Sequence, residues 1–216
     1  MQSDGQTGTQ PAPILLHERS ATASVLLLPG LDDSGAGHWQ SQWAMLSDFR
    51  RVDFGDWTHP TPDQWVPRLD RAVRESTRPL VLAAHSLGCL TAAWWASLMW
   101  SEAFRDKLVG ALLVAPADVE AGVEPRLHSF APLPLRPLPF RTIVVASRND
   151  PYAAFARSQA MAAAWGAELV DAGEAGHINA ESDLGGWPEG LRLLARLTGH
   201  KGNLLTAELG LRIAFA

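Results

Sequence analysis

The stretch L-V-L-A-A-H-S-L-G, residues 80–88, places a serine directly after an apolar run, where a strand turns sharply into a helix. This layout predicts a nucleophile elbow, in which the serine backbone is strained and its hydroxyl projects above the edge of the sheet. Gly88 fits the usual G-x-S-x-G pattern, whereas Ala84 replaces the first glycine and adds only a methyl group. The pattern alone has low specificity, because Ser86 would also be a favoured cap for the following helix. Ser86 is therefore a candidate nucleophile that requires partners elsewhere in the chain.

Two later loops carry the residue types that a nucleophilic serine requires. Residues 141–146 read as a buried, β-branched strand that runs into a loop with Asp150. Residues 167–171 read as another strand, followed by a glycine-rich loop with His177 near its tip. The order serine, aspartate, histidine, each after a parallel strand, is the order used in the α/β-hydrolase fold. Ser86, Asp150 and His177 are thus predicted to form a catalytic triad.

Each partner also has a simpler interpretation. Asp150 precedes Pro151, and proline at the first helical position would make this aspartate an ordinary helix cap. His177 is one of seven histidines and would by default be a surface side chain. Asp118, which follows the apolar run 110–115, is a rival acid from the neighbouring strand end. The triad is favoured because its members fall together where a histidine must lie between a serine and a carboxylate.

The loop after the first apolar strand is a candidate oxyanion hole. Residues 24–29 end at Gly30, and the glycine-rich loop 30–37 follows. In this architecture the negative oxygen accepts hydrogen bonds from the amide after the nucleophile, here Leu87, and from an early-loop amide, here Leu31. A flexible loop without a chemical role is the simpler alternative. A phosphate-binding loop is excluded, because alanine and glycine stand where lysine and serine or threonine are required.

On these segments the chain resembles the small lid-less serine hydrolases of the α/β-hydrolase fold, the retinoblastoma-binding protein nine-like family. The resembling segments are L-P-G-L (28–31) with G-H-W (37–39), A-H-S-L-G (84–88), A-S-R-N-D-P-Y (146–152), and G-H-I-N (176–179) with G-G-W-P (185–188). The resemblance implies hydrolysis of esters or amides, with Ser86, Asp150 and His177 as the triad.

Alternating strand and helix patterns predict the architecture. Strands are expected at 25–28, 51–54, 80–83, 109–114, 142–146 and 168–171, and helices at 39–47, 62–75, 86–99, 151–165 and 187–196. This alternation predicts an α/β fold: a three-layer α/β/α sandwich around a mainly parallel, twisted sheet of about six strands, without a lid domain. The substrate crevice is then expected between the strands that end at Gly30 and at Ser86.

Further residues are expected around this crevice. The proline- and leucine-rich segment 125–140 is interpreted as a rigid extended loop overhanging the site, with an adaptor-binding proline motif as the alternative. Most tryptophans are expected in the core, because they recur inside helical patterns. The candidate wall residues of the substrate cleft are Gly30, His38, Trp39, Trp57 and Trp187.

Composition limits the class of protein. The 216 residues, 47% of them hydrophobic, suffice for one globular domain, which we place at residues 24–199. The single cysteine, Cys89, rules out an internal disulfide framework and a metal site of the cysteine type, and it indicates a reducing compartment. The net charge of −5 and the pI of about 5.8 argue against nucleic acid binding. We expect a small-molecule substrate, no cofactor and no metal.

Both ends of the chain lie outside the predicted domain. Residues 1–23 are polar and contain prolines, so we expect a disordered tail there and no signal peptide. The sequence contains no run of about 18 apolar residues, which is the length needed to span a bilayer. We therefore expect a cytoplasmic protein without membrane contact. Residues 200–216 form an extension that could dock on the domain, join two subunits or be disordered. An oligomer is therefore compatible with the sequence but not indicated by it.

Two functions of different classes remain. The first is a serine hydrolase that acts on a small carboxylic ester or amide through an acyl-enzyme intermediate. It is carboxylesterase-like, with amidase or aminopeptidase action left open. The second is a binding or scaffold protein on the same fold that is catalytically weak or inactive, since a fold alone does not give a function.

Overall fold

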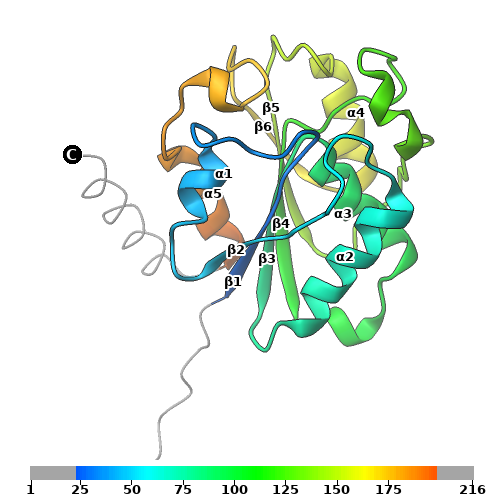
Figure 1. Ribbon diagram of the computed structural model, residues 1–216, viewed down its shortest axis with the longest axis vertical. Helices are drawn as coiled ribbons and strands as arrows, with labels where there is room; N and C mark the ends of the chain where they lie inside the picture. The colour runs from blue at the N-terminus through cyan, green and yellow to red at the C-terminus, as the bar shows by residue number, and fades with distance from the viewer. Residues whose placement is uncertain (1–22, 199–216) are drawn as a thin grey trace, which may run out of the picture.

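The computed structural model describes residues 23–198, in which one sheet is covered on both faces by helices (Figure 1). All strands are parallel, in the order β2-β1-β3-β4-β5-β6. The strands are β1 (Ser24–Leu28), β2 (Phe49–Arg51), β3 (Leu80–His85), β4 (Leu108–Val114), β5 (Arg141–Ala146) and β6 (Glu168–Asp171). The helices are α1 (Trp39–Trp43), α2 (Pro62–Glu75), α3 (Leu87–Leu98), α4 (Phe155–Trp165) and α5 (Pro188–Thr198), with the 3-10 helices η1 (Glu102–Phe104), η2 (Pro125–Phe130) and η3 (Ala180–Ser182). The predicted three-layer α/β fold is confirmed.

Apolar side chains alternate between the two faces of the sheet and form two cores. In β1, Leu26 and Leu28 belong to the core under α2, α3 and α4, whereas Val25 and Leu27 belong to the core under α1 and α5 (Figure 1). Every residue of β3 is buried. Such continuously apolar strands are typical of parallel sheets that are covered on both faces.

The reversal of strand order locates the site. β1 and β3 are neighbours, with Leu28 beside Ala84. The chain continues from β1 to β2 on one side and from β3 to β4 on the other. In parallel sheets, ligands bind beyond the strand ends at such a switch point. The loops that follow β1 and β3 therefore meet where the sequence predicted the crevice.

Some element boundaries agree with the prediction and one strand is displaced. The helix at 62–75 and the strand at 168–171 are found as predicted. The second strand was expected at 51–54, but β2 lies at Phe49–Arg51. The predicted strand fails because Phe54 leaves the sheet and stacks on Trp65 of α2, with ring centroids 4.5 Å apart.

Two helices are shorter than predicted. α1 ends at Trp43, because residues 44–47 turn back toward the edge strand. α4 begins at Phe155 and not at 151, because a carboxylate oxygen of Asp150 accepts the Tyr152 N–H at 2.9 Å and holds a turn there. This turn fixes Asp150 at the end of β5.

The segment 125–140 differs from the expected extended loop at its start. Residues Pro125–Phe130 form η2, and the indole N–H of Trp94 on α3 donates to the Phe130 carbonyl oxygen at 3.0 Å. Arg126 and Leu127 of η2 line the pocket described below, so the segment does border the site.

The expected disordered tail at 1–23 lies, except for Ala23, outside the described residues, and so does the extension at 200–216. Within residues 23–198, no helix combines the length and the apolar character needed to cross a bilayer.

Candidate active site

Ser86 lies on a strained turn between β3 and α3. Its backbone angles, φ 51° and ψ −118°, fall in a region that residues with a side chain rarely adopt. Two glycines permit the close packing around it. A Cβ on Gly30 would stand 2.9 Å from the Ser86 Cβ, and one on Gly88 would overlap the backbone of Leu28. Ala84 is fully buried in β3, so its methyl group is accommodated beside the turn.

His177 and Asp150 form a buried pair. The imidazole Nδ1 lies 2.9 Å from one carboxylate oxygen of Asp150 and 3.0 Å from the other. The two side chains are only 8% and 3% exposed. Because both oxygens accept, Nδ1 carries the proton and Nε2 carries the lone pair. Within residues 23–198 this Nε2 has no hydrogen-bond partner, which leaves it available as a base.

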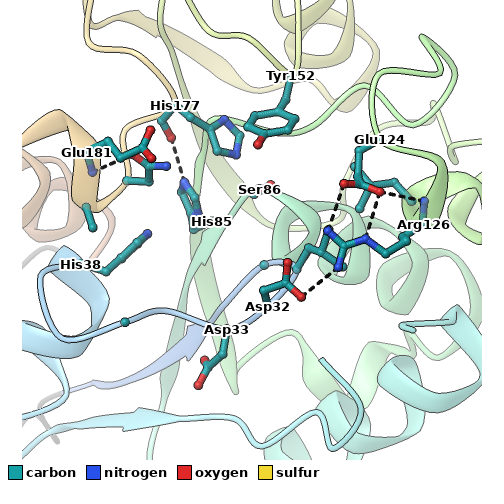
Figure 2. A pocket seen from close by; sticks show the side chains of 16 residues that line it. Asp32, Asp33, His38, His85, Ser86, Glu124, Arg126, Tyr152, His177 and Glu181 are labelled. Carbon is teal, nitrogen blue, oxygen red and sulfur yellow. Dashed lines mark hydrogen bonds and ion pairs between the residues drawn. The ribbon is translucent and has the colours of Figure 1, made fainter. Parts of the chain in front are cut away.

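Ser86 and His177 line the same pocket, which has a volume of about 270 Å³ (Figure 2). The Ser86 hydroxyl makes no hydrogen bond to any described residue, including His177. Catalytic hydrogen bonds are often long or misaligned without a substrate. The structure thus brings the predicted nucleophile and base to one cavity, with the carboxylate behind the base.

The loops that carry Asp150 and His177 are tied to each other by polar side chains that the sequence did not single out. Asn149 Oδ1 accepts the Gly176 N–H at 2.7 Å and the Ser147 hydroxyl at 2.8 Å. The same Ser147 oxygen accepts the Ala175 N–H at 2.9 Å. The S-R-N-D motif was the available signal, because Ser147 and Asn149 lie within three residues of the carboxylate of Asp150.

Two rings hold the imidazole of His177 in place. The His85 Nε2–H donates to the His177 carbonyl oxygen at 2.9 Å, and the two ring centroids lie 4.8 Å apart. On the other side, the Tyr152 ring lies with its centroid 4.5 Å from that of His177. The only tyrosine of the chain therefore borders both the base and the pocket.

The rival acid Asp118 is engaged elsewhere. One of its carboxylate oxygens lies 3.3 Å from the Arg157 Nε and accepts the Glu120 N–H at 3.1 Å. Its backbone N–H donates to the Tyr152 carbonyl oxygen. Among the described residues, the carboxylate that contacts His177 is that of Asp150.

The two amides predicted for the oxyanion hole are both free. Neither the Leu31 N–H nor the Leu87 N–H has an acceptor among the described residues. A Cβ on Gly30 would lie 3.4 Å from the Leu87 nitrogen, so the loop after β1 runs close to the start of α3. Asp32 and Asp33 follow with positive φ angles of 58° and 64°, which turn the loop sharply after Leu31. The amides are available to an oxyanion at Ser86.

The expected wall residues divide into two groups. Gly30 and His38 line the pocket, whereas Trp39, Trp57 and Trp187 do not. Trp39 is 1% exposed, and its indole N–H donates to the Ile178 carbonyl oxygen at 3.0 Å. Trp39 and Trp187 fill core positions and Trp57 is partly buried against the core, because large, flat rings pack well against each other.

Partners of these tryptophans show where they lie. Trp187 packs against the rings of both Trp39 and Trp43, which also contact each other. Trp57 packs on Phe54 and Trp65 in the other core. The sequence interpretation placed them at the cleft because they are close in sequence to the cleft loops, whereas their rings pack on other aromatic side chains.

Charged side chains surround the mouth of the pocket. The carboxylates are those of Asp32, Asp33, Glu124 and Glu181. The Arg126 guanidinium donates to Asp32 at 2.9 Å and to Glu124 at 3.0 Å, and so connects the loop after β1 to η2 (Figure 2). Arg126 holds the pKa of the Glu124 carboxyl below its usual value. No sequence motif signals this contact, since Asp32 and Arg126 lie 94 residues apart.

A row of three histidines borders the pocket on its inner side. The His38 and His85 ring centroids are 4.6 Å apart, and His85 lies beside His177. Burial is the main reason that the pKa of His85 lies well below its usual value. Burial, and then the Arg51 charge, lowers the pKa of His38 to about 4. Both imidazoles are therefore neutral at pH 7.

Comparisons with known proteins identify the family of the chain and its fold. The sequence model of a family described as serine hydrolase matches residues 25–196. A search of curated proteins found no significant match. A solved structure of a protein described as a YdeN-like hydrolase, from Pectobacterium atrosepticum, is 36% identical over 82% of this chain and 91% of its own, with a TM-score of 0.73.

Two more distant structures share the fold. The ydeN gene product of B. subtilis is 18% identical over 83% of this chain and 100% of its own, with a TM-score of 0.67. A thermophilic esterase from Thermogutta terrifontis is 18% identical over 83% of this chain and 92% of its own, with a TM-score of 0.58.

Proposed function

The chain belongs to the serine hydrolase family, and we propose that it hydrolyses small carboxylic esters through a Ser86–His177–Asp150 triad and an acyl-enzyme intermediate. The observation that carries this proposal is the orientation of His177. Asp150 accepts its Nδ1–H, its Nε2 has no partner among the described residues, and His177 lines the pocket that Ser86 also lines. A histidine held in this tautomer can accept a proton from a serine hydroxyl.

In the first half of the proposed reaction, His177 Nε2 takes the hydroxyl proton while Ser86 Oγ attacks the ester carbonyl carbon. The carbonyl oxygen becomes an oxyanion, and the free amides of Leu31 and Leu87 donate hydrogen bonds to it. The tetrahedral intermediate then expels the alcohol, which receives its proton from His177. Asp150 stabilises the imidazolium throughout and keeps its orientation.

In the second half, a water molecule replaces the alcohol. His177 takes a proton from this water as its oxygen attacks the acyl carbon, and the same two amides hold the oxyanion. Collapse breaks the bond to Ser86 Oγ, which regains a proton from His177. The carboxylic acid leaves, and the site returns to its starting state.

The pocket supports a small substrate. Its volume of about 270 Å³ is small for a ligand site, and residues of η2 form part of its wall. Amides are harder to cleave than esters, so we take an ester as the preferred substrate and an amide as the open alternative. A cytoplasmic location also remains a proposal, on the basis of the single buried thiol, Cys89.

One observation favours a second candidate function, an inactive binding protein on this fold. The Ser86 hydroxyl is not hydrogen-bonded to His177 among the described residues, so the nucleophile is not activated in the resting geometry. If that geometry persisted with a substrate bound, the serine would stay unreactive. Reactivity of the serine therefore separates the two candidates.

A fluorophosphonate probe tests the proposal directly. Attack by Ser86 Oγ would form an oxygen–phosphorus bond and expel fluoride, and we expect stoichiometric labelling at Ser86 by mass spectrometry. We expect Ser86→Ala to abolish labelling and to lower kcat for an activated short-chain ester by roughly 10⁵-fold or more. The control is Ser47→Ala, an exposed serine outside the pocket, which should change neither. Unlabelled wild-type protein would favour the binding protein, and full turnover by Ser86→Ala would disprove the triad.

A further inference from the structure

His38 carries a hydrogen-bond donor that no described residue uses. Its side chain is 4% exposed and lines the pocket. The backbone N–H of Gln40 donates to His38 Nδ1 at 3.1 Å. Because a backbone N–H can only donate, Nδ1 carries the lone pair, and the proton of the neutral ring is on Nε2. This Nε2–H is buried and has no acceptor within residues 23–198.

The side chains of His85 and Gln40 next to His38 have partners, and within residues 23–198 the other buried polar side-chain atoms without one are an Asp33 oxygen and the Arg157 Nε. The His85 Nε2–H donates to the His177 carbonyl oxygen. The Gln40 amide nitrogen donates to the carbonyl oxygens of Leu28 and Ala83, and its oxygen accepts the Ser34 hydroxyl. Buried donors without acceptors are rare, because they destabilise the native state. The exception at His38 points to an acceptor that comes from outside the chain.

The position of His38 excludes a role as a second base. The His85 ring lies between His38 and His177, so His38 does not contact the imidazole that would take the proton from Ser86. In Figure 2, His38 and Glu181 lie at one end of the pocket, and Arg126 and Glu124 lie at the other. His38 is thus placed to contact a part of the substrate beyond the reacting carbonyl.

A metal site does not explain the free nitrogen. Within residues 23–198, no three histidine, cysteine, aspartate or glutamate side chains are arranged to hold a metal ion. The neighbouring His85 already uses its Nε2 to bind the His177 carbonyl oxygen.

The charge state of His38 limits the ligand chemistry. Burial and the Arg51 charge hold its pKa at about 4, so the ring is a neutral donor at pH 7. A neutral N–H pairs with an oxygen that has a free lone pair, and it offers nothing to an ammonium group or to a purely apolar chain.

We propose that His38 is a substrate-binding residue whose Nε2–H donates to a second oxygen of the ester, distinct from the scissile carbonyl oxygen. This inference rests on the proposed ester hydrolysis. The preferred substrates are then small esters with an ether, hydroxyl or carbonyl oxygen close to the scissile bond, in the acyl or the alcohol part. Such an oxygen satisfies the donor, whereas a methylene group in its place leaves it unpaired.

Two pairs of esters of equal size test this on the full-length protein. The acyl pair is para-nitrophenyl methoxyacetate and para-nitrophenyl butanoate, and the alcohol pair is methoxyethyl acetate and butyl acetate. Each pair exchanges one ether oxygen for one methylene group. The measured quantity is the ratio of kcat/KM for the ether to kcat/KM for the alkyl member. Comparing this ratio between wild type and variant cancels the intrinsic reactivity of each ester.

Two variants remove the donor in different ways. His38→Phe keeps a ring without nitrogens, and His38→Asn keeps an acceptor for the Gln40 N–H but leaves the Nε2 position empty. We expect the ratio for one pair to fall roughly 5- to 10-fold in both variants, about the contribution of one hydrogen bond. The control His59→Asn, at an exposed histidine outside the pocket, should leave both ratios unchanged.

The outcomes separate this inference from the proposed function. Unchanged ratios for both pairs in active His38 variants would overturn the role of His38 and leave ester hydrolysis standing. Absence of wild-type turnover for all four esters would overturn the proposed function and this inference with it.

A measurement on the wild-type chain covers the case in which the variants do not fold. We expect ¹⁵N NMR to find the proton of His38 on Nε2. We also expect this proton signal to shift in the Ser86 adduct of a methoxy-substituted phosphonate more than in the adduct of its alkyl counterpart. A proton on Nδ1, or equal shifts with both adducts, would overturn the proposal.

Discussion

Gly88, at the start of α3, lies against the end of β1 so closely that a Cβ atom would overlap the carbonyl oxygen of Leu28. The same Cβ would come within 2.7 Å of the Pro29 carbonyl oxygen. Both obstacles are backbone atoms, one at the end of β1 and one in the residue after it, so neither can move aside without disturbing the sheet edge. The approach of α3 to β1 therefore depends on glycine, and it sets where Ser86 stands.

We expect Gly88→Ala to lower the free energy of unfolding by about 2 kcal/mol or more, as overpacking does in a tight core. The helix preference for alanine over glycine, about 1 kcal/mol, acts in the opposite direction and is outweighed. Urea denaturation measures the change. Gly35→Ala is the control, because its Cβ would meet nothing within 4 Å. A Gly88→Ala protein as stable as wild type would contradict this packing.

Gly30 controls the oxyanion hole. A methyl group there would stand 2.9 Å from the Ser86 Cβ and 3.3 Å from the His85 carbonyl oxygen, and so would push the loop away from the elbow. We expect Gly30→Ala to move the Leu31 amide and to lower kcat by about 10²- to 10³-fold, as loss of one oxyanion donor does. Steady-state kinetics measure this. The control is Gly37→Ala, which should retain kcat because the nearest atom to its Cβ would be 3.6 Å away. Equal kcat values in the two variants would refute the role of Leu31.

Asp150 and Asp118 are distinguished by the same substitution. We expect Asp150→Asn to lower kcat by about 10⁴-fold, because an amide no longer enforces the tautomer of His177 or stabilises its charged form. Asp118→Asn breaks an ion pair with Arg157 and should change kcat only a few-fold. Parallel kinetics on the two variants decide the acid. A larger loss for Asp118→Asn would assign that role to Asp118 instead.

The parts of the fold that the sequence predicted are those that local pattern determines. The helix at 62–75 has proline at its first position and an apolar stripe, and both features are local. β2 was misplaced because its sequence, F-R-R, lacks an apolar alternation. It is a strand only through its pairing with β1. Edge strands of this kind are defined by their neighbour and not by their own residues.

The same distinction applies to the site. Ser86, Asp150 and His177 could be predicted because each follows a strand, and parallel strand ends share one edge of the sheet. The direction of individual rings could not be predicted. His38 and Trp39 are adjacent in sequence, yet one lines the pocket and the other fills the core. The directions of the two side chains depend on how α1 packs against the sheet, and no local sequence pattern predicts that packing.

The charge of the pocket mouth leads to an expectation about substrates. Four carboxylates and one guanidinium, that of Arg126, line the pocket, and one of the carboxylates, Asp33, pairs with the Arg51 guanidinium at 2.9 Å, so three carboxylates remain against Arg126. An excess of negative charge raises the local concentration of cations and repels anions. We therefore expect an ester with a trimethylammonium group to have a KM several-fold lower than its neutral tert-butyl isostere. The difference should shrink as the salt concentration rises, since the mouth is open to solvent.

Substitution of single carboxylates tests that expectation. Glu181→Gln should reduce the preference for the cationic ester, whereas Glu189→Gln on α5, outside the pocket, should leave it unchanged. The measurement is the ratio of the two KM values at low and at high salt. A ratio near one at low salt in the wild-type protein would show that the mouth does not attract cations.

The buried histidines make stability depend on pH. Burial lowers the pKa of His38 from 6.5 to about 4 in the folded protein. Between these two values the unfolded chain binds a proton at this position and the folded chain does not. The free energy of unfolding therefore falls as the pH falls through this window. Above pH 6.5, neither state binds the proton, so His38 causes no further change with pH. The difference between the two pKa values corresponds to about 3 kcal/mol.

Urea denaturation at pH 8 and at pH 4.5 measures this loss. The charges of Arg51 and of protonated His177 lower the pKa of His38, and His85 packs against its ring; the lowered pKa of His85 adds a loss in the same direction. We expect His38→Asn, which keeps the cap of α1, to lose about 2 kcal/mol less than wild type between the two pH values. His59→Asn, at an exposed position, should lose as much as wild type. Equal losses in His38→Asn and wild type would mean that the folded protein protonates His38 as readily as the unfolded chain does.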